Sequence, residues 1–244
     1  MPGVDWGPMG SGLLVAVEGP SAAGKTTLTE AAGAGTSWNV LTEAYRRVVP
    51  SLSLEFGSPE ELLALERTLL REEVRRYREA ADLAHGGATV VADTGFLGPL
   101  TYTAALVAGG RAPAPVLATL LHEARGLGER GEWGLADAYV YLDTPPELRA
   151  SRARADPAGA PPELAARHRE MGELERAFYL EHFARLWGPN FRVVAGDRPV
   201  PELVATLTRA VADLHAAPES TVRLDDVLGL LADAGTPTSP RGNR

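Results

Sequence analysis

The chain has 244 residues, of which 45% are hydrophobic and 23% charged, a balance typical of a globular protein with a buried core. Acidic residues outnumber basic ones by 32 to 24, and the net charge of −8 argues against a nucleic-acid-binding or basic membrane-surface protein. Cysteine is absent, which excludes disulfides, thiolate metal sites and cysteine nucleophiles. No apolar run could span a bilayer and no secretory leader is visible, so we expect a cytoplasmic protein.

Strands and helices are predicted to alternate along the chain. After a Gly- and Pro-rich tail over residues 1–11, apolar runs predict strands at 13–17, 38–42, 88–93, 138–143 and 191–196. Helical spacing predicts helices at 28–34, 59–85, 98–109, 113–126, 145–154, 162–187 and 200–216. We therefore expect an α/β fold of three layers, with a five-stranded, mostly parallel sheet flanked by helices. One domain would cover residues 12–216, followed over 217–244 by a short helix and a disordered tail.

The helix predicted over residues 59–85 has the clearest N-terminal capping signals. Ser58 is placed to cap it, Pro59 takes its first position, and Glu61 is placed to complete a capping box. Its long amphipathic pattern can pair with a second copy to form a homodimer, or it can simply cover the sheet.

Residues 19–27 match a phosphate-binding loop. They read Gly19-Pro20-Ser21-Ala22-Ala23-Gly24-Lys25-Thr26-Thr27 and satisfy G-x-x-x-x-G-K-[ST] without a mismatch, between a predicted strand and a predicted helix. Backbone N–H groups and the helix N-terminus would face phosphate oxygens. Lys25, the one lysine of the chain, would reach the β- and γ-phosphates, and the Thr26 hydroxyl would bind Mg²⁺. The motif predicts nucleotide binding with ATP and Mg²⁺ as cofactors, and the lack of a second lysine argues against a guanine-reading GTPase.

Beyond this loop, the order of several segments resembles that of P-loop kinases of small molecules. These are the deoxynucleoside kinases, the thymidylate-kinase-like proteins and the nicotinamide-riboside-kinase-like ATPases. The similar segments are TEAYRRV (42–48), VVADTG (90–95), YLDTPPELRASRARAD (141–156) and VVAGDRPVPELVATL (193–207). The resemblance implies the P-loop NTPase fold with a helical lid at about residues 152–169. It also implies transfer of the γ-phosphate of ATP to a hydroxyl of a nucleoside or nucleoside-like compound.

Two departures from the kinase pattern concern the acceptor side. The acid that ends the third strand, Asp93, is followed by Thr94, where deoxynucleoside and thymidylate kinases have an arginine that holds the substrate. The acid after the second strand, Glu43, is followed by Ala44 instead of the proline common in these kinases. The acceptor pocket can therefore differ from a deoxynucleoside or thymidylate pocket.

Three acids end predicted strands, where ligands bind in open α/β sheets. Glu43 is the candidate base that accepts the proton of the attacking hydroxyl, and its alternative is an exposed position at a helix start. Asp93 could hold Mg²⁺ or act as the base in place of Glu43, and its alternative is to cap the turn with Gly95. Asp143 is expected to cap the helix that follows it.

The remaining candidates are arginines and aromatic residues. The resemblance places Arg152 near the adenine or the phosphates, and Arg154 and Arg167 would reach the substrate from the lid. Candidate acceptor-binding residues are Tyr45, Arg46, Arg47, Phe96 and Tyr102. The alternatives are surface charge for the arginines and core packing for the aromatic residues.

The function most consistent with these residues is an ATP- and Mg²⁺-dependent phosphotransferase for a small-molecule hydroxyl. The expected partner is the small-molecule acceptor, with neither nucleic acid nor membrane. A nucleoside monophosphate kinase, which Arg46 and Arg47 would favour, stays open, as does a phosphotransferase for an antibiotic hydroxyl. A regulatory ATPase that acts through a partner protein is the alternative of a different class.

Overall fold

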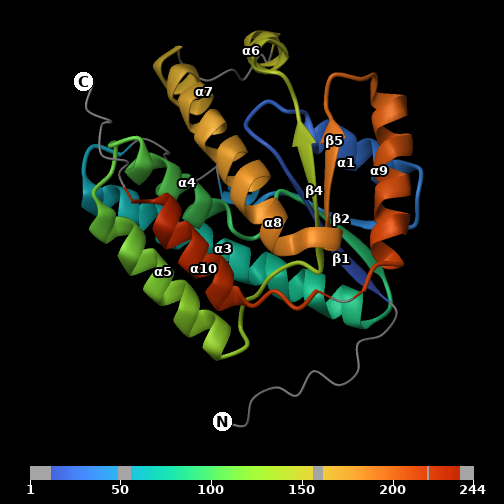
Figure 1. The fold of residues 1–244 in the computed structure, drawn as a ribbon, viewed down its shortest axis with the longest axis horizontal. Coiled ribbons are helices and arrows are strands. Elements are labelled where there is room, and N and C mark those ends of the chain that lie inside the picture. The colour runs from blue at the N-terminus through green and yellow to red at the C-terminus, as the bar shows by residue number, and fades with distance from the viewer. Residues whose placement is uncertain (1–11, 49–55, 156–161, 219, 237–244) are drawn as a thin grey trace.

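A five-stranded parallel sheet forms the centre of the molecule (Figure 1). The computed structural model describes residues 12–48, 56–155, 162–218 and 220–236, except for the side chains of residues 162–169. The strands are β1 (Leu13–Glu18), β2 (Asn39–Leu41), β3 (Thr89–Asp93), β4 (Ala138–Asp143) and β5 (Phe191–Ala195). They pair in the order β2-β3-β1-β4-β5, and each pair is parallel. The predicted sheet is therefore confirmed, with every strand where the apolar runs placed it.

Helices cover both faces of the sheet, so the central strand β1 is buried along its whole length. On one face, Val15 and Val17 pack with α1 (Lys25–Ala34) and α9 (Val200–His215). Ala16, between them on the strand, points into the core on the opposite face. One hydrophobic core on each side of the sheet gives the three layers that the alternation of strands and helices predicts.

The second face carries most of the helices (Figure 1). They are α3 (Pro59–His85), α4 (Gly98–Ala108), α5 (Ala114–Glu129), α7 (Pro162–Ala177), α8 (Ala184–Trp187) and α10 (Leu224–Ala234). The predicted helix 162–187 is interrupted by one π-helical segment, η2 (Phe178–Phe183). Helix α10 contacts α4 and α5 and buries three side chains in the same core, so this C-terminal helix is an integral part of the α/β unit.

Three short elements lie at the strand ends: α2 (Ala44–Val48), α6 (Pro146–Ala155) and the 3₁₀ turn η3 (Gly188–Asn190). The first of these is not among the predicted helical ranges, and it begins directly after Glu43, where the alternative interpretation of Glu43 places a helix start. The predicted tail 1–11, the tip of the predicted lid and the end of the chain from residue 237 lie outside the described residues.

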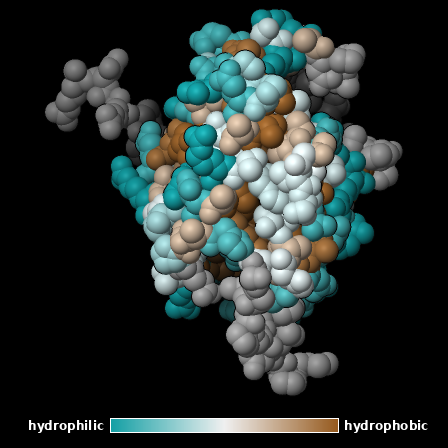
Figure 2. All heavy atoms as spheres, turned by 90° about the vertical axis from the view of Figure 1, so that its right-hand side faces the viewer, coloured by the Kyte–Doolittle hydropathy of each residue, from teal (hydrophilic) through white to brown (hydrophobic). Residues whose placement is uncertain are grey.

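Figure 2 shows the face on the side of α9, where hydrophobic residues are dispersed among hydrophilic ones. Val193 and Val200, two of the larger exposed apolar side chains, lie on β5 and α9. None of the described helices is both long enough and apolar enough to cross a membrane.

Helix α3 begins as the sequence predicts, with one difference. The Ser58 hydroxyl accepts the N–H of Glu61 at 3.2 Å, and Pro59 takes the first turn, where its missing N–H costs nothing. The Glu61 carboxylate accepts the N–H of Gly57 at 2.6 Å, so the predicted reciprocal bond to Ser58 is wrong. The carboxylate reaches one residue further back, because the N–H of Gly57 also lies outside the helix and needs an acceptor. The helix then packs on β1, β2 and β3, so it covers the sheet, which is one of the two roles that its amphipathic pattern allows.

The Ser58 cap predicts a stability effect that mutation can measure. We expect Ser58→Ala to lower the free energy of unfolding by about 1 kcal/mol, since the N–H of Glu61 loses its acceptor. Thr68→Ala is the control, because the Thr68 hydroxyl bonds only to the Ala64 carbonyl within α3 and alanine favours helices. Urea unfolding measures both variants, and equal effects would contradict the capping role.

Candidate functional site

The loop between β1 and α1 has the backbone of a phosphate-binding loop. Gly19 and Gly24 have φ angles of 147° and 97°, in the region that only glycine adopts readily. A Cβ atom at Gly19 would lie 2.8 Å from the Leu142 carbonyl oxygen, so the close packing of the loop on β4 also requires glycine. Helix α1 begins at Lys25, and its first N–H groups have no partners within the helix. Loop and helix N-terminus together form an anion-binding surface.

Asp93 at the end of β3 joins this loop to the sheet. The Thr26 hydroxyl donates to Asp93 Oδ2 at 2.6 Å, while Lys25 Nζ donates to the Gly19 carbonyl at 2.6 Å. Asp93 is buried, and its other oxygen, Oδ1, has no hydrogen-bond partner among the described residues. A buried oxygen without a donor is costly, which suggests that it serves a ligand. A hydroxyl beside a carboxylate is an oxygen donor set that suits Mg²⁺, so these residues fit the ion that the motif predicts.

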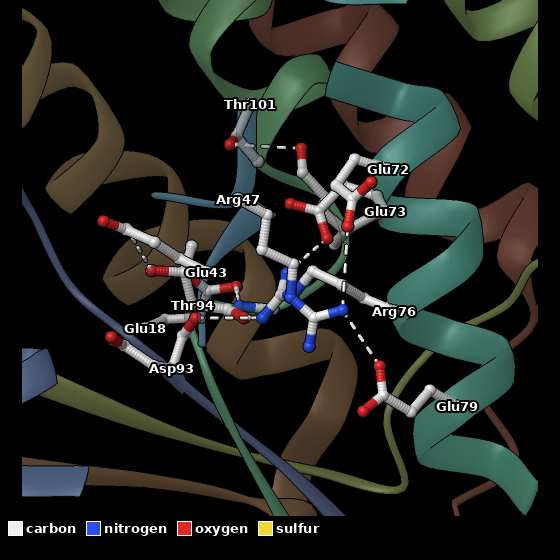
Figure 3. A network of polar contacts seen from close by, with 12 residues as sticks. Glu18, Glu43, Arg47, Glu72, Glu73, Arg76, Glu79, Asp93, Thr94 and Thr101 are labelled. Atoms are coloured by element: carbon white, nitrogen blue, oxygen red, sulfur yellow. Dashed lines mark hydrogen bonds and ion pairs between the residues drawn. The ribbon is translucent and has the colours of Figure 1, made fainter. Parts of the chain in front are cut away.

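The turn after β3 is held in a strained conformation by a buried arginine. Thr94 has a φ of 64°, which is rare for a β-branched residue. The Arg76 guanidinium donates to the carbonyls of Asp93 and Thr94 at 3.0 and 2.9 Å, and it pairs with Glu73 on the same helix. Figure 3 shows Arg76 reaching from α3 toward the end of β3, where Glu43, Asp93 and Thr94 lie close together. Because Thr94 is held this way, its hydroxyl donates to Glu43 Oε2 at 3.4 Å.

Glu18, the last residue of β1, also contacts the turn after β3. Its carboxylate accepts the N–H of Gly95 at 3.0 Å, and a Cβ atom at Gly95 would lie 2.4 Å from Glu18 Oε1. The side chain is buried, and burial raises the pKa of Glu18, although Lys25 opposes this shift. The glycine after Thr94 is therefore required for close packing against an acid.

A cavity of about 170 Å³ opens beside this turn. It is lined by Glu43, Ala44, Tyr45, Leu65, Glu66, Leu69, Glu73, Thr94, Gly98, Pro99 and Tyr102, which come from the end of β2, α2, α3 and the turn that leads into α4. Three of these side chains are carboxylic acids, and no lysine, arginine or histidine is among the described lining residues.

The two acids that α3 contributes are deeply buried. Glu66 is 1% exposed, and its Oε2 has no hydrogen-bond partner within the part of the chain that the structure describes. Burial raises the pKa of Glu66 to about 8. Burial also raises the pKa of Glu73 to about 7, and the neighbouring Arg76 guanidinium limits that shift. Glu43 differs from both, since a quarter of its side chain is exposed.

The structure brings together only some of the predicted acceptor residues. Glu43, Tyr45 and Tyr102 line the cavity. Phe96 is fully buried and meets the Tyr77 ring edge-on, so it belongs to the core instead.

The predicted arginine pair lies outside the lining. Arg46 bonds to Glu43 Oε1 at 3.3 Å with half of its side chain exposed, and Arg47 pairs with Glu72 and Glu79 at 3.6 and 2.9 Å. Both arginines lie on α2, whose short turn directs Arg46 back to Glu43. The same turn directs Arg47 toward two carboxylates of α3 that are not among the lining residues.

Arg152 lies against the phosphate-binding loop, as the resemblance implies. Its guanidinium donates to the carbonyls of Ala23 and Gly196, the latter at 3.1 Å, and one of its nitrogens is the nearest atom to a Cβ built on Gly24. Arg154 on the same helix is exposed, and the side chain of Arg167 lies outside the described residues.

Asp143 does not cap the helix after β4, and the prediction for it is wrong. Its two oxygens accept bonds of 2.7 and 2.8 Å from the Arg176 guanidinium on α7. Arg149 of α6 is buried and pairs with Glu173, so α7 is tied to both β4 and α6. A bidentate pair with arginine satisfies a carboxylate better than a single backbone N–H does.

Glu66, Glu73 and Arg76 are functional candidates that the sequence interpretation missed. The helical period places Glu66 and Glu73 on the same face of α3 as Leu62 and Leu70, which are buried. Acids on the apolar stripe of an amphipathic helix are unusual, and this pattern could have identified them. Arg76 is separated from the turn that it supports by 17 residues, and no local pattern reveals that contact.

Comparison with known proteins confirms a nucleotide-binding architecture. A family model described as an AAA domain matches residues 14–182, which include the loop, Asp93 and the cavity. The chain belongs to this AAA domain family. No curated protein matches the sequence of this AAA domain protein significantly.

Solved structures of deoxyadenosine kinase from M. mycoides are similar to this AAA domain protein. One, with the products dCMP and a flexible dCDP bound, has a TM-score of 0.61 at 14% identity and covers 81% of this chain and 98% of its own. A second, with dATP bound, has a TM-score of 0.62 at 13% identity and covers 82% and 100%. A third, with dCTP bound, has a TM-score of 0.55 at 14% identity and covers 81% and 98%. The protein is thus a P-loop protein with the fold of a deoxynucleoside kinase.

The buried Glu66 predicts a pH dependence of stability. Its pKa rises from an ordinary 4.5 to about 8, so within this range the folded protein holds a proton that the unfolded chain has released. Stability therefore falls as the pH rises through this range, and Glu66→Gln removes that contribution. We expect the variant to gain stability relative to the unmodified protein between about pH 5 and pH 8 in urea unfolding. A difference that stays constant with pH would contradict the burial of an unpaired acid.

Proposed function

We propose that this protein transfers the γ-phosphate of ATP to a hydroxyl of a small molecule, with a nucleoside or nucleoside-like compound as the preferred acceptor. One observation carries the proposal: the phosphate-binding loop and the cavity meet at two consecutive residues. Asp93 accepts the hydroxyl of Thr26 from the loop, and Thr94 donates to Glu43 of the cavity. Phosphoryl transfer needs a donor and an acceptor that are held close and in line, and this junction offers both sites.

The donor side would work through charge and position. The N–H groups of the loop and Lys25 bind phosphate oxygens, and Lys25 would exchange its present bonds to the Gly19 and Pro20 carbonyls for the phosphates. Thr26 and Asp93 would hold Mg²⁺, which neutralises charge on the phosphates. Arg152 fixes the shape of the loop through the Ala23 carbonyl.

On the acceptor side, Glu43 would accept the proton of the attacking hydroxyl. Its carboxylate is oriented by two contacts, from the Thr94 hydroxyl to Oε2 and from Arg46 to Oε1. A base that is fixed in place and partly exposed can pass the proton that it accepts on to solvent. Asp93 is the second candidate for the base, but its contact with Thr26 favours the role at the metal.

The comparisons support a nucleoside-like acceptor, since the similar structures are named deoxyadenosine kinase and hold deoxynucleotides. A nucleoside monophosphate acceptor is less favoured, because no basic side chain is among the described cavity residues. An antibiotic hydroxyl fits the same groups. A regulatory ATPase would not need an acceptor cavity joined to the loop. A lid at about residues 152–169, the domain limits, a cytoplasmic location and a homodimer remain predictions from the sequence.

A coupled assay of ADP release tests the activity. With ATP and Mg²⁺, we expect one of several acceptor pools (nucleosides, nucleoside monophosphates, vitamins or hydroxylated antibiotics) to raise ADP release above the rate without acceptor. ATP binding without stimulation by any pool would favour the regulatory ATPase.

Two variants test the proposed roles of Glu43 and Lys25. Glu43→Gln should lower kcat by about 10²- to 10⁴-fold and leave ATP affinity unchanged, because it removes only the proton acceptor. Lys25→Ala should lower the transfer rate by roughly 100-fold or more, because the phosphates lose a charged donor. Arg209→Gln, at an exposed position on α9, is the control. Full activity in Lys25→Ala would rule out the proposed donor site.

Asp93→Asn tests the metal role separately from transfer. Asparagine keeps an oxygen for the Thr26 hydroxyl but loses the charge that attracts Mg²⁺. We expect the unmodified protein to bind a fluorescent ATP analogue roughly tenfold more tightly with Mg²⁺ than with EDTA, and the variant to lose most of that difference. An equal response of both proteins to Mg²⁺ would contradict the role.

A further inference from the structure

The charge balance of the acceptor cavity points to the chemistry of its ligand. Three carboxylic acids line the cavity, and the described lining residues include no basic side chain. Two of the acids are already compensated: Glu73 pairs with Arg76, and Glu43 bonds to Arg46 and Thr94. Glu66 is the exception, because its Oε2 is buried with no hydrogen-bond partner among the described residues.

An unpaired buried carboxyl group is costly unless a ligand supplies its partner. Burial is the sole cause of the raised pKa of Glu66, so the described residues place no compensating cation beside it. The helix could carry a leucine here at lower cost, as it does at the neighbouring Leu65 and Leu69. An acid at this position is therefore consistent with a binding role.

The rest of the lining favours a cation over a neutral hydrogen-bond donor. Tyr45 on α2 and Tyr102 on α4 contribute aromatic rings, while Leu65, Leu69 and Pro99 contribute apolar surface. Aromatic rings together with a carboxylate are the groups that recognise organic cations in water-excluded sites.

We propose that the acceptor is a hydroxyl-bearing organic cation whose positively charged nitrogen binds at Glu66 while its hydroxyl faces Glu43. This inference rests on the proposed function, since it names the acceptor class for the same cavity. It also separates this protein from kinases of phosphorylated acceptors, because an anionic group would meet three carboxyl groups and no described basic side chain.

Proton release is a specific consequence of this arrangement. With a pKa of about 8, Glu66 holds a proton at neutral pH in the free protein, and a bound cation favours the ionised form. Among the described residues, the other titratable groups that face the cavity are Glu43, Glu73, Tyr45 and Tyr102. The Arg46 and Arg76 guanidinium groups lie beside the first two. Cation binding at pH 7 should thus release a proton. Glu66 should supply most of it, because Glu73 has the lower pKa of about 7 and is already paired with Arg76.

Paired ligands test the proposal by isothermal titration calorimetry on the whole chain. The probes are N1-methyladenosine and N3-methylcytidine, which are cations at neutral pH, against their neutral parents adenosine and cytidine, together with choline and its neutral carbon isostere. We expect at least one cation to bind about tenfold or more tightly than its neutral partner. Titration in two buffers of different ionisation enthalpy should show proton release with that cation.

Glu66→Gln keeps the shape of the side chain and removes its charge. It should therefore abolish both the preference for cations over their neutral partners and the release of a proton on binding. Glutamine is close in shape to the protonated side chain, so we expect the variant to fold, and urea unfolding checks this. Glu123→Gln, at the Arg67 pair on the surface of α5, is the matched control and should keep both effects. A cation preference that survives in Glu66→Gln overturns the proposal. Binding equal to that of the neutral partners, or no cation binding at about 10 mM, overturns it as well.

Transfer assays on the same pairs separate this inference from the proposed function. Phosphorylation of neutral acceptors without a preference for cations supports the transferase and overturns the cation site. Cation binding that depends on Glu66, without phosphorylation of any cation that binds, supports the cation site and counts against the transferase.

Discussion

The bonds from Arg76 to the carbonyls of Asp93 and Thr94 hold the one turn on which the site depends. A guanidinium with no exposure to water is costly, and its partners here are a buried carboxylate and two backbone oxygens. These bonds keep Thr94 in a left-handed conformation that a threonine rarely adopts. This single arrangement directs Asp93 toward the phosphate-binding loop and Thr94 toward Glu43.

The sequence departs from the kinase pattern at this same turn, and the structure shows what replaces the missing arginine. Deoxynucleoside and thymidylate kinases have an arginine directly after the third-strand acid, and this chain has Thr94 there. An arginine does lie at the same turn, but it comes from α3 and binds the backbone from the buried side. Among the described lining residues, the cavity side of the turn thereby has no basic group, and acids dominate there. The absence of a pocket arginine and the proposed preference for a cationic ligand would have the same origin, the turn after Asp93.

Arginine also connects the helices above the phosphate-binding loop. Arg152 binds the loop itself, Arg149 pairs with Glu173, and Arg176 pairs with Asp143 at the end of β4. A Cβ atom on Gly172 would lie 2.6 Å from the Arg149 guanidinium and 3.1 Å from Pro20, so α7 packs directly on the loop. Any movement of α6 and α7 during nucleotide exchange would have to break these pairs, and the partly exposed ones cost least to break.

The sequence by itself determined the phosphate-binding loop, the five strands and the start of α3. These features depend on patterns within a few residues, such as glycines at fixed spacing, apolar runs and a capping serine, and local physical chemistry is enough to specify them. Tertiary structure alone decided which acids face the cavity, that Asp143 binds Arg176, and that Phe96 belongs to the core. The contact between Thr94 and Glu43 joins residues 51 positions apart, and that between Asp143 and Arg176 joins residues 33 apart. Such partners become neighbours only when the sheet and its helices pack, because charge and burial depend on everything that surrounds a side chain and not on its place in the chain.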